Sequence, residues 1–260
     1  MIFERYLLQN NLLSDSKTLL DQYSASGTLS LLQKDSINYY FGKTYYILDK
    51  PDTAAYFFSK VSKKSELYAE SVFTKTYLCL NDADTSSLLC TLNSIQSDRP
   101  LTNELRSFTK ASLFLYLRDT LNFNNCKSTF SDSVKDLTEF ENKLVSIKNT
   151  IPKYDKSGFV AGALSAMVPG LGKIYSGKPK QGITTFLPVV LLGLQAFEAY
   201  SKGGIKSPWF IFDSGLFTIF YIGNIWGSVL SVSVKRKEIQ NEVNNQILLN
   251  MRIPLQKLFR

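Results

Sequence analysis

The sequence predicts an all-α protein in which an array of helical hairpins precedes a transmembrane helical hairpin, with a re-entrant or interfacial helix between them. Three observations lead to this class. Apolar residues recur at helical spacing through the first part of the chain, an internal repeat lies inside that part, and two long stretches with almost no charge follow it. The predicted domains are a helical repeat domain (1–150), a hinge with a proline–glycine motif (151–182), a two-span transmembrane hairpin (183–234) and a basic amphipathic tail (235–260).

Charge is distributed unevenly along the chain. Residues 1–150 contain as many acidic as basic residues, so the formal net charge of +8 comes from residues 151–260. Such an excess favours an anionic partner, either nucleic acid or anionic lipid. Because the basic residues flank the uncharged stretches, we expect a lipid bilayer as the partner and no nucleic acid.

Several kinds of catalytic and metal site lack the residues that they need. The chain has no histidine, which excludes Ser-His-Asp and Cys-His nucleophilic sites and the imidazole ligands of most catalytic metals. Its cysteines, Cys79, Cys90 and Cys126, form no C-x-x-C pair, and we expect them to be buried as small apolar residues. The sequence therefore predicts no enzyme, no metal and no cofactor.

The internal repeat pairs the segment YYILDKPDTAAYFF, which begins at Tyr45, with YLCLNDADTSSLLC, which begins at Tyr77. In each copy an apolar helix stops at a short polar turn. Asp52 or Asp84 is then placed to be the N-cap of a second helix. The sequence therefore predicts two helical hairpins of similar build.

The first copy resembles a tetratricopeptide repeat, a family with a fixed spacing of small and aromatic positions. The matching residues are Gly42, Tyr45, Ala54 and Phe58, and Tyr77 corresponds to Tyr45 in the second copy. In the family the small residues let two helices approach closely, and the aromatic residues fill the groove against the next hairpin. The resemblance implies stacked hairpins whose concave side binds a protein or peptide. The alternative is that these aromatic residues belong only to the core.

Further helices complete the predicted repeat domain. A helical pair precedes the repeats within residues 1–33, and a third hairpin covers about 104–130. An amphipathic helix then runs over Ser133–Thr150, with Ser131 or Asp132 as its N-cap.

Three apolar stretches follow the hinge. Residues 183–200 and 208–234 each carry a single charged residue and approach or exceed the roughly 20 apolar residues that a helix needs to cross a bilayer. Residues 159–172 carry no charge but are fewer, which suits a re-entrant or interfacial helix that ends at Pro169. The alternative is a soluble domain with two apolar core helices. Such a domain needs amphipathic helices around the core, and almost none remain in this part of the chain.

The segment PGLGKIYSGKPKQG, residues 169–182, contains G-x-x-x-x-G-K at 172–178, which is most of a phosphate-binding loop pattern. A phosphate-binding loop needs a strand before it and a Ser or Thr after the lysine to hold magnesium. Here a Gly/Ala-rich apolar helix comes first, and Pro179 occupies the Ser/Thr position. We conclude that the segment is not a nucleotide-binding loop.

The same segment resembles the P-G-x-G-x-x-Y-x-G-x-x-x-x-G motif of small bacterial two-span membrane domains. The motif residues, called here the proline–glycine motif, are Pro169, Gly170, Gly172, Tyr175, Gly177 and Gly182. Pro169 ends the preceding helix and the glycines permit a tight loop, while Tyr175 is expected at the level of the lipid headgroups. The resemblance covers about 159–235. Together with the tetratricopeptide-like repeats it implies a bacterial family of uncharacterised function.

Small residues four apart indicate where the apolar helices pack in lipid. Gly223 and Gly227 have this spacing, and Asn224 beside them is placed to donate a hydrogen bond across the interface. The lysines of the proline–glycine motif are expected to face lipid phosphates. They are Lys173, Lys178 and Lys180.

Glu198 and Asp213 are the only acidic residues in the two long apolar stretches. Each lies close to the short connecting loop, where Lys202 and Lys206 would neutralise them. The alternative is an ion or proton relay through the two acids, because acidic residues inside a membrane often mark function.

Basic residues are enriched on both flanks of the two spans. The positive-inside rule places such flanks in the cytoplasm, and the repeat domain with them. The first ten residues contain Glu4 and no long apolar run, so we do not expect them to be a signal peptide. An export signal ahead of them would place the repeat domain in the periplasm instead. The tail is expected either on the membrane surface or packed on the repeat domain.

These features predict a non-enzymatic adaptor or scaffold in the bacterial cytoplasmic (inner) membrane. It would bind a protein or peptide through the repeat array, in membrane-protein insertion, secretion or envelope biogenesis. The alternative is a small channel or transporter subunit that uses Glu198 and Asp213. A second copy of the chain, in a homo-oligomer, is a further candidate partner.

Overall fold

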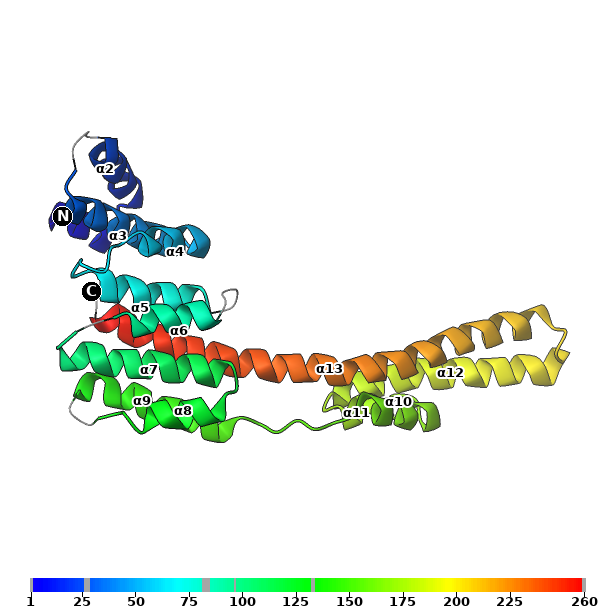
Figure 1. The fold of residues 1–260 in the computed structure, drawn as a ribbon. Coiled ribbons are helices and arrows are strands. Elements are labelled where there is room, and N and C mark those ends of the chain that lie inside the picture. Colours follow the sequence, from blue (N-terminus) through cyan, green and yellow to red (C-terminus); the bar gives the residue numbers. More distant parts are fainter. Residues whose placement is uncertain (1, 26–28, 81–84, 96, 132–133, 259–260) are drawn as a thin grey trace. The chain divides into compact units, whose positions relative to one another are not determined.

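The computed structural model describes the chain except residues 1, 26–28, 81–84, 96, 132–133 and 259–260 (Figure 1). The described residues form thirteen α-helices and no β-strand, so the predicted all-α class is confirmed. The chain divides into two compact units. Unit 1 contains residues 1–150 and 244–260, and unit 2 contains residues 151–243.

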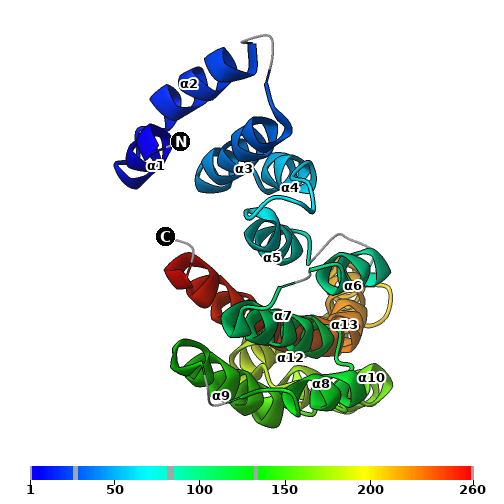
Figure 2. The ribbon, with the colours of Figure 1, turned by 60° about the vertical axis from the view of Figure 1, so that its left-hand side comes forward.

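Unit 1 is a succession of helices joined by short connections, in which neighbours along the chain lie side by side (Figure 2). The end of the last helix, α13 (Pro208–Leu258), also belongs to this unit. The other helices of unit 1 are α1 (Ile2–Gln9), α2 (Leu13–Ala25), α3 (Leu31–Ile47), α4 (Pro51–Ser59), α5 (Tyr68–Leu78), α6 (Thr85–Asn93), α7 (Pro100–Tyr116), α8 (Thr120–Lys127) and α9 (Lys135–Thr150).

Local signals in the sequence set several helix starts. Ser30 and Gln33 form a capping box at α3, in which the Ser30 side chain accepts from the Gln33 N–H at 3.3 Å and the Gln33 side chain accepts from the Ser30 N–H at 2.9 Å. At α8 the Asp119 carboxylate accepts from the Asn122 N–H at 3.0 Å. These side chains satisfy N–H groups that the first turn of a helix leaves without a partner.

The prediction that Asp52 is an N-cap was wrong. Helix α4 begins at Pro51, and its N-cap is Lys50, whose side chain forms no capping hydrogen bond. Because the fixed φ of proline suits the first helical position, Asp52 falls inside the first turn, where its charge favours the positive end of the helix dipole. Asp84, the corresponding residue of the second copy, lies outside the described residues.

The prediction that Ser131 caps the helix before Thr150 was also wrong. The Ser131 N–H and hydroxyl instead donate to the Glu104 carboxylate at 2.5 Å and 2.7 Å, and α9 begins only at Lys135. Glu104 is buried on α7, so its carboxylate needs these two donors, and the contact holds Ser131 four residues before the first residue of α9. Asp132, the other predicted cap, lies outside the described residues.

Large apolar side chains form the core of unit 1. The largest fully buried ones are Phe73, Phe108, Phe123, Leu20, Leu92, Ile95, Leu105, Leu113, Leu115, Leu137, Leu144 and Ile247. The cysteines do not belong to this core, contrary to our expectation, because Cys79 and Cys126 are half-buried and Cys90 is exposed.

Unit 2 is built from α10 (Gly158–Met167), α11 (Leu171–Tyr175), α12 (Pro179–Gly203) and the part of α13 that ends at Val243. Helices α12 and α13 are long and apolar enough to cross a membrane, whereas α10 is a shorter apolar helix. Glycines with positive φ break the chain between these helices, at Gly170 (84°), Gly177 (91°) and Gly204 (69°).

Helix α13 continues past Val234, where the sequence predicted the end of the second span. The basic triplet after it consists of good helix formers and does not interrupt the backbone, and Pro254 also lies inside the helix. The last turns pack within unit 1, where Asn250 Nδ2 donates to the Phe140 carbonyl at 2.8 Å. The part of the predicted tail from Asn244 onward therefore packs against the other helices of unit 1.

Candidate functional site

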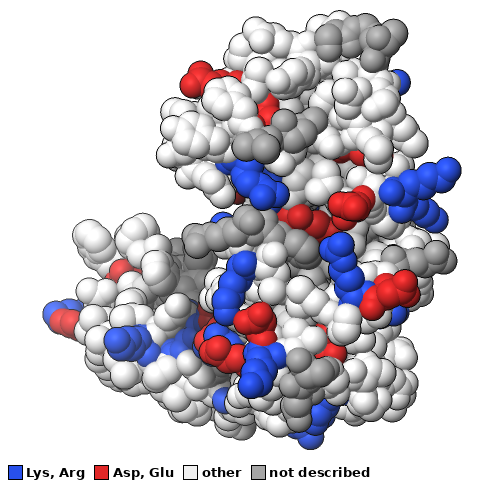
Figure 3. Space-filling model, turned by 90° about the vertical axis from the view of Figure 1, so that its left-hand side faces the viewer, with Lys and Arg blue, Asp and Glu red and all other residues white. Residues whose placement is uncertain are grey.

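An open pocket of about 820 Å³ lies in unit 1 and receives side chains from α1, α3, α4, α5 and the end of α13. We call it the aromatic pocket, because its lining includes Tyr39, Tyr40, Tyr46, Phe58 and Tyr77. Its charged lining residues are Arg5, Lys43, Glu70 and Lys257. Figure 3 shows the same mixture on this face, where Lys and Arg side chains lie beside Asp and Glu side chains.

Glu70 is the acidic group of the pocket. Lys43 Nζ lies 3.0 Å from Glu70 Oε1, with side chains that are 28% and 13% exposed, and the Lys43 ammonium also lies 5.1 Å from the centre of the Tyr39 ring. Burial raises the pKa of the Glu70 carboxyl, while Lys43 and a hydrogen bond from Tyr39 act in the opposite direction. Burial and the Glu70 charge likewise raise the pKa of the Tyr39 hydroxyl.

Tyr46 on α3 contacts residues of both α5 and the end of α13. Its ring meets the Tyr77 ring edge-on at 6.4 Å, and the Arg252 guanidinium lies 5.9 Å from its centre. The Tyr46 hydroxyl accepts a hydrogen bond from Gln256 Nε2 at 3.4 Å. The pocket therefore combines apolar ring faces with polar groups that converge on it, as binding sites for organic ligands and peptides do.

The predicted repeat residues occupy two positions relative to the pocket. Phe58 and Tyr77 line it, whereas Gly42, Tyr45 and Ala54 do not. A Cβ at Gly42 would lie 2.7 Å from the Phe58 ring, so only glycine lets α3 and α4 approach this closely. Ala54 is fully buried, and the Tyr45 ring stacks on Phe57 at 5.5 Å. The packing of these residues holds α3 and α4 together and so fixes the position of the Phe58 ring in the pocket lining.

Sequence reasoning missed the residues that close the pocket from both ends of the chain. Arg5 comes from α1, and Ile253, Leu255 and Lys257 come from the end of α13. Nothing in their local pattern marks them. The one sequence feature that could have indicated the pocket was the group of aromatic residues on α3, which includes Tyr39 and Tyr40.

In unit 2 the glycines of the proline–glycine motif bring backbones into contact. A Cβ at Gly170 would lie 2.2 Å from the Gly182 carbonyl oxygen, and one at Gly172 would lie 1.9 Å from the Ala161 carbonyl oxygen. Gly170 and Gly177 also have positive φ, which favours glycine. The motif thus folds α10, α11 and the start of α12 tightly against one another.

The other two motif residues lie at the edges of this fold. Pro169 follows Val168, the residue at which α10 ends. The Tyr175 carbonyl accepts from Lys156 Nζ, whose ammonium lies 5.1 Å from the centre of the Tyr175 ring. The Tyr175 hydroxyl accepts from the Ser157 N–H at 3.4 Å. Tyr175 therefore holds the hinge segment before α10.

A line of buried polar side chains, called here the polar seam, joins α10 and α11 to α13. Its residues are Ser165, Ser176, Asn224, Ser228 and Ser231. Asn224 Oδ1 accepts from the Gly170 N–H at 3.1 Å, and Asn224 Nδ2 donates to the Ser165 carbonyl at 3.4 Å. Ser165 Oγ donates to Ser228 Oγ at 2.7 Å, and Ser231 Oγ donates to Ser176 Oγ at 2.8 Å.

The glycines beside Asn224 do not have the close helix contacts that their spacing predicted. A Cβ at Gly223 would meet open space, and one at Gly227 would meet only the Lys173 side chain, at 3.6 Å from Cε. Helices α10 and α11 contact α13 instead along the face that carries the polar seam, where the hydrogen bonds between them are made.

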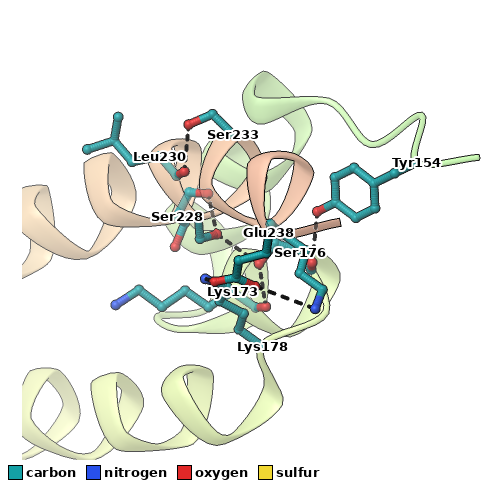
Figure 4. Close-up of polar contacts among 10 residues, drawn as sticks. Tyr154, Lys173, Ser176, Lys178, Ser228, Leu230, Ser233 and Glu238 are labelled. Atoms are coloured by element: carbon teal, nitrogen blue, oxygen red, sulfur yellow. Dashed lines mark hydrogen bonds and ion pairs between the residues drawn. The ribbon is translucent and has the colours of Figure 1, made fainter. Parts of the chain in front are cut away.

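The three lysines of the motif have different surroundings, two of which Figure 4 shows. Lys178 Nζ forms an ion pair with Glu238 Oε1 at 2.6 Å, and Lys180 is exposed. Lys173 Nζ donates to Thr185 Oγ1 at 2.8 Å. That the three lysines face lipid phosphates stays a prediction, and Lys178 has an acidic partner in its own unit.

The two acids predicted within the apolar stretches are not brought together by any contact that the structure describes. Glu198 Oε1 pairs with Lys202 Nζ at 2.5 Å on the exposed surface of α12. Asp213 is half-buried near the start of α13. The ion pair of Glu198 matches the neutralisation expected from Lys202, whereas no ion pair joins Asp213 to Lys206 among the described residues.

No group of His, Cys, Asp or Glu residues in the described part of the chain could hold a metal ion. No protein-family model, curated protein or solved structure matches the chain. The interpretation of the two sites therefore depends on their own geometry.

Proposed function

We propose that the protein is a membrane-anchored adaptor that binds a segment of another protein in the aromatic pocket. The observation that carries this proposal is the pocket itself, whose lining combines five aromatic residues with a Lys43–Glu70 ion pair. Ring faces accept apolar side chains, and Arg5 and Lys257 add positive charge at the lining. The bound segment would therefore present an aromatic or aliphatic residue next to an acidic one.

The anchor in this proposal is unit 2. Only 17% of an 18-residue apolar stretch of α12 and 22% of such a stretch of α13 are buried in the protein. Most of their large apolar side chains therefore need to be covered by something else. A bilayer covers such helices all round, and the basic residues at their flanks would face the cytoplasm of a bacterium. The adaptor would act at the cytoplasmic membrane in protein insertion, secretion or envelope assembly, as the resemblance of its two parts to tetratricopeptide repeats and to two-span membrane domains implies.

A position-specific photo-crosslinker in the native membrane tests the proposal. The crosslinking amino acid replaces Thr74, which lines the pocket, or Leu121, which is 78% exposed on α8 and does not line it. We expect a discrete protein adduct from position 74 and none of the same size from position 121. The substitution Tyr77→Ser in the pocket should remove the adduct, since the ring supplies apolar contact area.

The outcomes separate the adaptor from its alternatives. An adduct twice the size of the chain would identify a second copy as the partner. Equal adducts from both positions, or an adduct unaffected by Tyr77→Ser, would contradict binding in the pocket.

A further inference from the structure

The Lys173 side chain lies among three helices of unit 2. It starts on α11, its ammonium donates to Thr185 on α12, and its end passes Gly227 on α13. A Cβ on Gly227 would lie 3.6 Å from Lys173 Cε and 3.7 Å from Nζ, so a larger side chain at this position would crowd the ammonium. Figure 4 shows Lys173 extended away from the carboxylate of Glu238.

In the described part of the chain, the only hydrogen-bond partner of the Lys173 ammonium is a neutral hydroxyl, that of Thr185. Among the described residues no acidic side chain forms an ion pair with Lys173. Glu238, further along α13, pairs with Lys178 and Lys235 instead. Gly227 and Glu238 are eleven residues apart on one helix, which separates them by roughly 16 Å along its axis. The Lys173 ammonium therefore lies away from Glu238, the acid that pairs with Lys178 and Lys235.

The surroundings of Lys173 favour an added anion. Burial lowers the pKa of its ammonium, which means that the folded chain removes water from the charge without supplying a counter-charge. On each of the three helices the residue next to Lys173, Thr185 or Gly227 in the sequence is apolar and exposed. These neighbours are Ile174, Phe186 and Trp226. A phospholipid carries a phosphate and acyl chains in one molecule, which suits a charged group on helices that also expose apolar side chains.

We propose that Lys173, Thr185 and Gly227 form a binding site for the phosphate of an anionic phospholipid. The site rests on the proposed placement of α12 and α13 in a bilayer. Thr185 orients the ammonium, Gly227 leaves room for the end of the Lys173 side chain, and the exposed apolar side chains of these helices contact the acyl chains. Lys178 takes no part, because Glu238 already neutralises it.

Tryptophan fluorescence measures the lipids next to this site. The chain has two tryptophans, and Trp226 directly precedes Gly227. In a Trp209→Phe background, the full chain is reconstituted into vesicles that contain brominated phosphatidylglycerol or brominated phosphatidylcholine, whose bromines quench Trp226. High ionic strength suppresses attraction that comes only from the general surface charge. We expect the anionic lipid to be enriched about fivefold near Trp226.

Matched variants assign this enrichment to the site. Lys173→Gln should abolish it and Lys173→Arg should restore most of it. Lys180→Gln removes an exposed lysine of the same motif and should leave it unchanged. Thermal unfolding followed by circular dichroism checks that each variant is folded.

Three results would overturn the proposal. The first is equal quenching by the two lipids, and the second is a preference that survives Lys173→Gln. The third is a preference abolished by inorganic phosphate, which would make the ligand a free anion. Failure of the chain to float with vesicles would also overturn the membrane placement, whereas flotation without lipid preference would overturn the Lys173 site alone.

Discussion

Unit 1 and unit 2 distribute apolar and polar side chains in opposite ways. The large side chains of the protein that are fully buried, such as Phe73, Phe108 and Leu144, lie in unit 1. In unit 2 the fully buried side chains are mostly small or polar, such as Ala161, Ser165 and Ser228, with Val189 among them, while many large apolar ones are exposed. The exposed ones include Phe159, Met167, Phe197, Trp209, Ile219 and Trp226, each at least 68% exposed.

This difference is what the proposed bilayer around unit 2 would require. In water the removal of apolar surface drives packing, and it does so in unit 1. In lipid that driving force is absent, so helices associate through close backbone approach and hydrogen bonds between side chains. Gly172 and Asn224 supply these two kinds of contact in unit 2. The predictions below test this contrast with pairs of substitutions.

The largest effect is expected from a phenylalanine in each unit. Phe73→Ala empties a fully buried position of unit 1 and should lower the free energy of unfolding by about 3–5 kcal/mol. Phe197→Ala removes a side chain that is 68% exposed in unit 2 and should change it by less than about 0.5 kcal/mol in detergent. Thermal and chemical unfolding of the full chain, followed by circular dichroism, compares the two. Similar losses would show that unit 2 has a core of the same kind.

A glycine pair tests close backbone approach in unit 2. The Cβ of Gly172→Ala would collide with the Ala161 carbonyl, and we expect a loss of roughly 1–3 kcal/mol. Gly223→Ala adds its Cβ in open space and should leave stability unchanged or raise it slightly. The unfolding transitions of both variants in the same detergent provide the measurement. A loss at Gly223 as large as that at Gly172 would contradict the observed packing.

The polar seam is tested by Asn224→Leu. This change removes the acceptor of the buried Gly170 N–H, and an N–H left unsatisfied costs about 1–3 kcal/mol. Ser233→Ala on the same helix removes an exposed hydroxyl that bonds only to its own turn, and it should have an effect within about 0.5 kcal/mol. Thermal stability that increases in Asn224→Leu would mean that the seam is not what joins α10 to α13.

The smallest expected effect is the pH dependence that Glu70 gives to unit 1. Since folding raises the pKa of this carboxyl, its contribution to stability is fully present below the ordinary pKa and is lost as the pH rises through the raised value. The unfolding free energy of the wild type, relative to Glu70→Gln, should therefore fall as the pH is increased from the ordinary pKa of a glutamate through the raised value. A difference that is constant over this interval, or that rises, would contradict the burial of the charge.

The sequence was sufficient for the features that depend on local pattern. Helical spacing predicts an all-α chain, and the length of the uncharged stretches predicts two long apolar helices. Turn positions also follow from residue type, as at Gly170, whose positive φ few other residues adopt. Phe58 and Tyr77 could be singled out because small and aromatic residues recur at fixed spacing.

Features that depend on distant contacts could not be read in the same way. The pocket is closed by Arg5 and Lys257, which are at opposite ends of the sequence and carry no pattern of their own. Ser131, predicted as a cap, instead donates to the buried Glu104 of α7, and α9 begins only four residues later. The small-residue spacing at Gly223 fits a helix interface, but the side of α13 that packs is decided by the hydrogen bonds of Asn224.

Cysteine labelling in the native membrane tests most directly whether lipid covers unit 2 and water covers unit 1. In a background without Cys79, Cys90 and Cys126, single cysteines replace Leu121 of unit 1 or Ile219 of unit 2, which are 78% and 68% exposed. We expect a water-soluble maleimide to label position 121 rapidly, and to label position 219 only after the membrane is dissolved in SDS. Rapid labelling of both positions in the intact membrane would contradict the account.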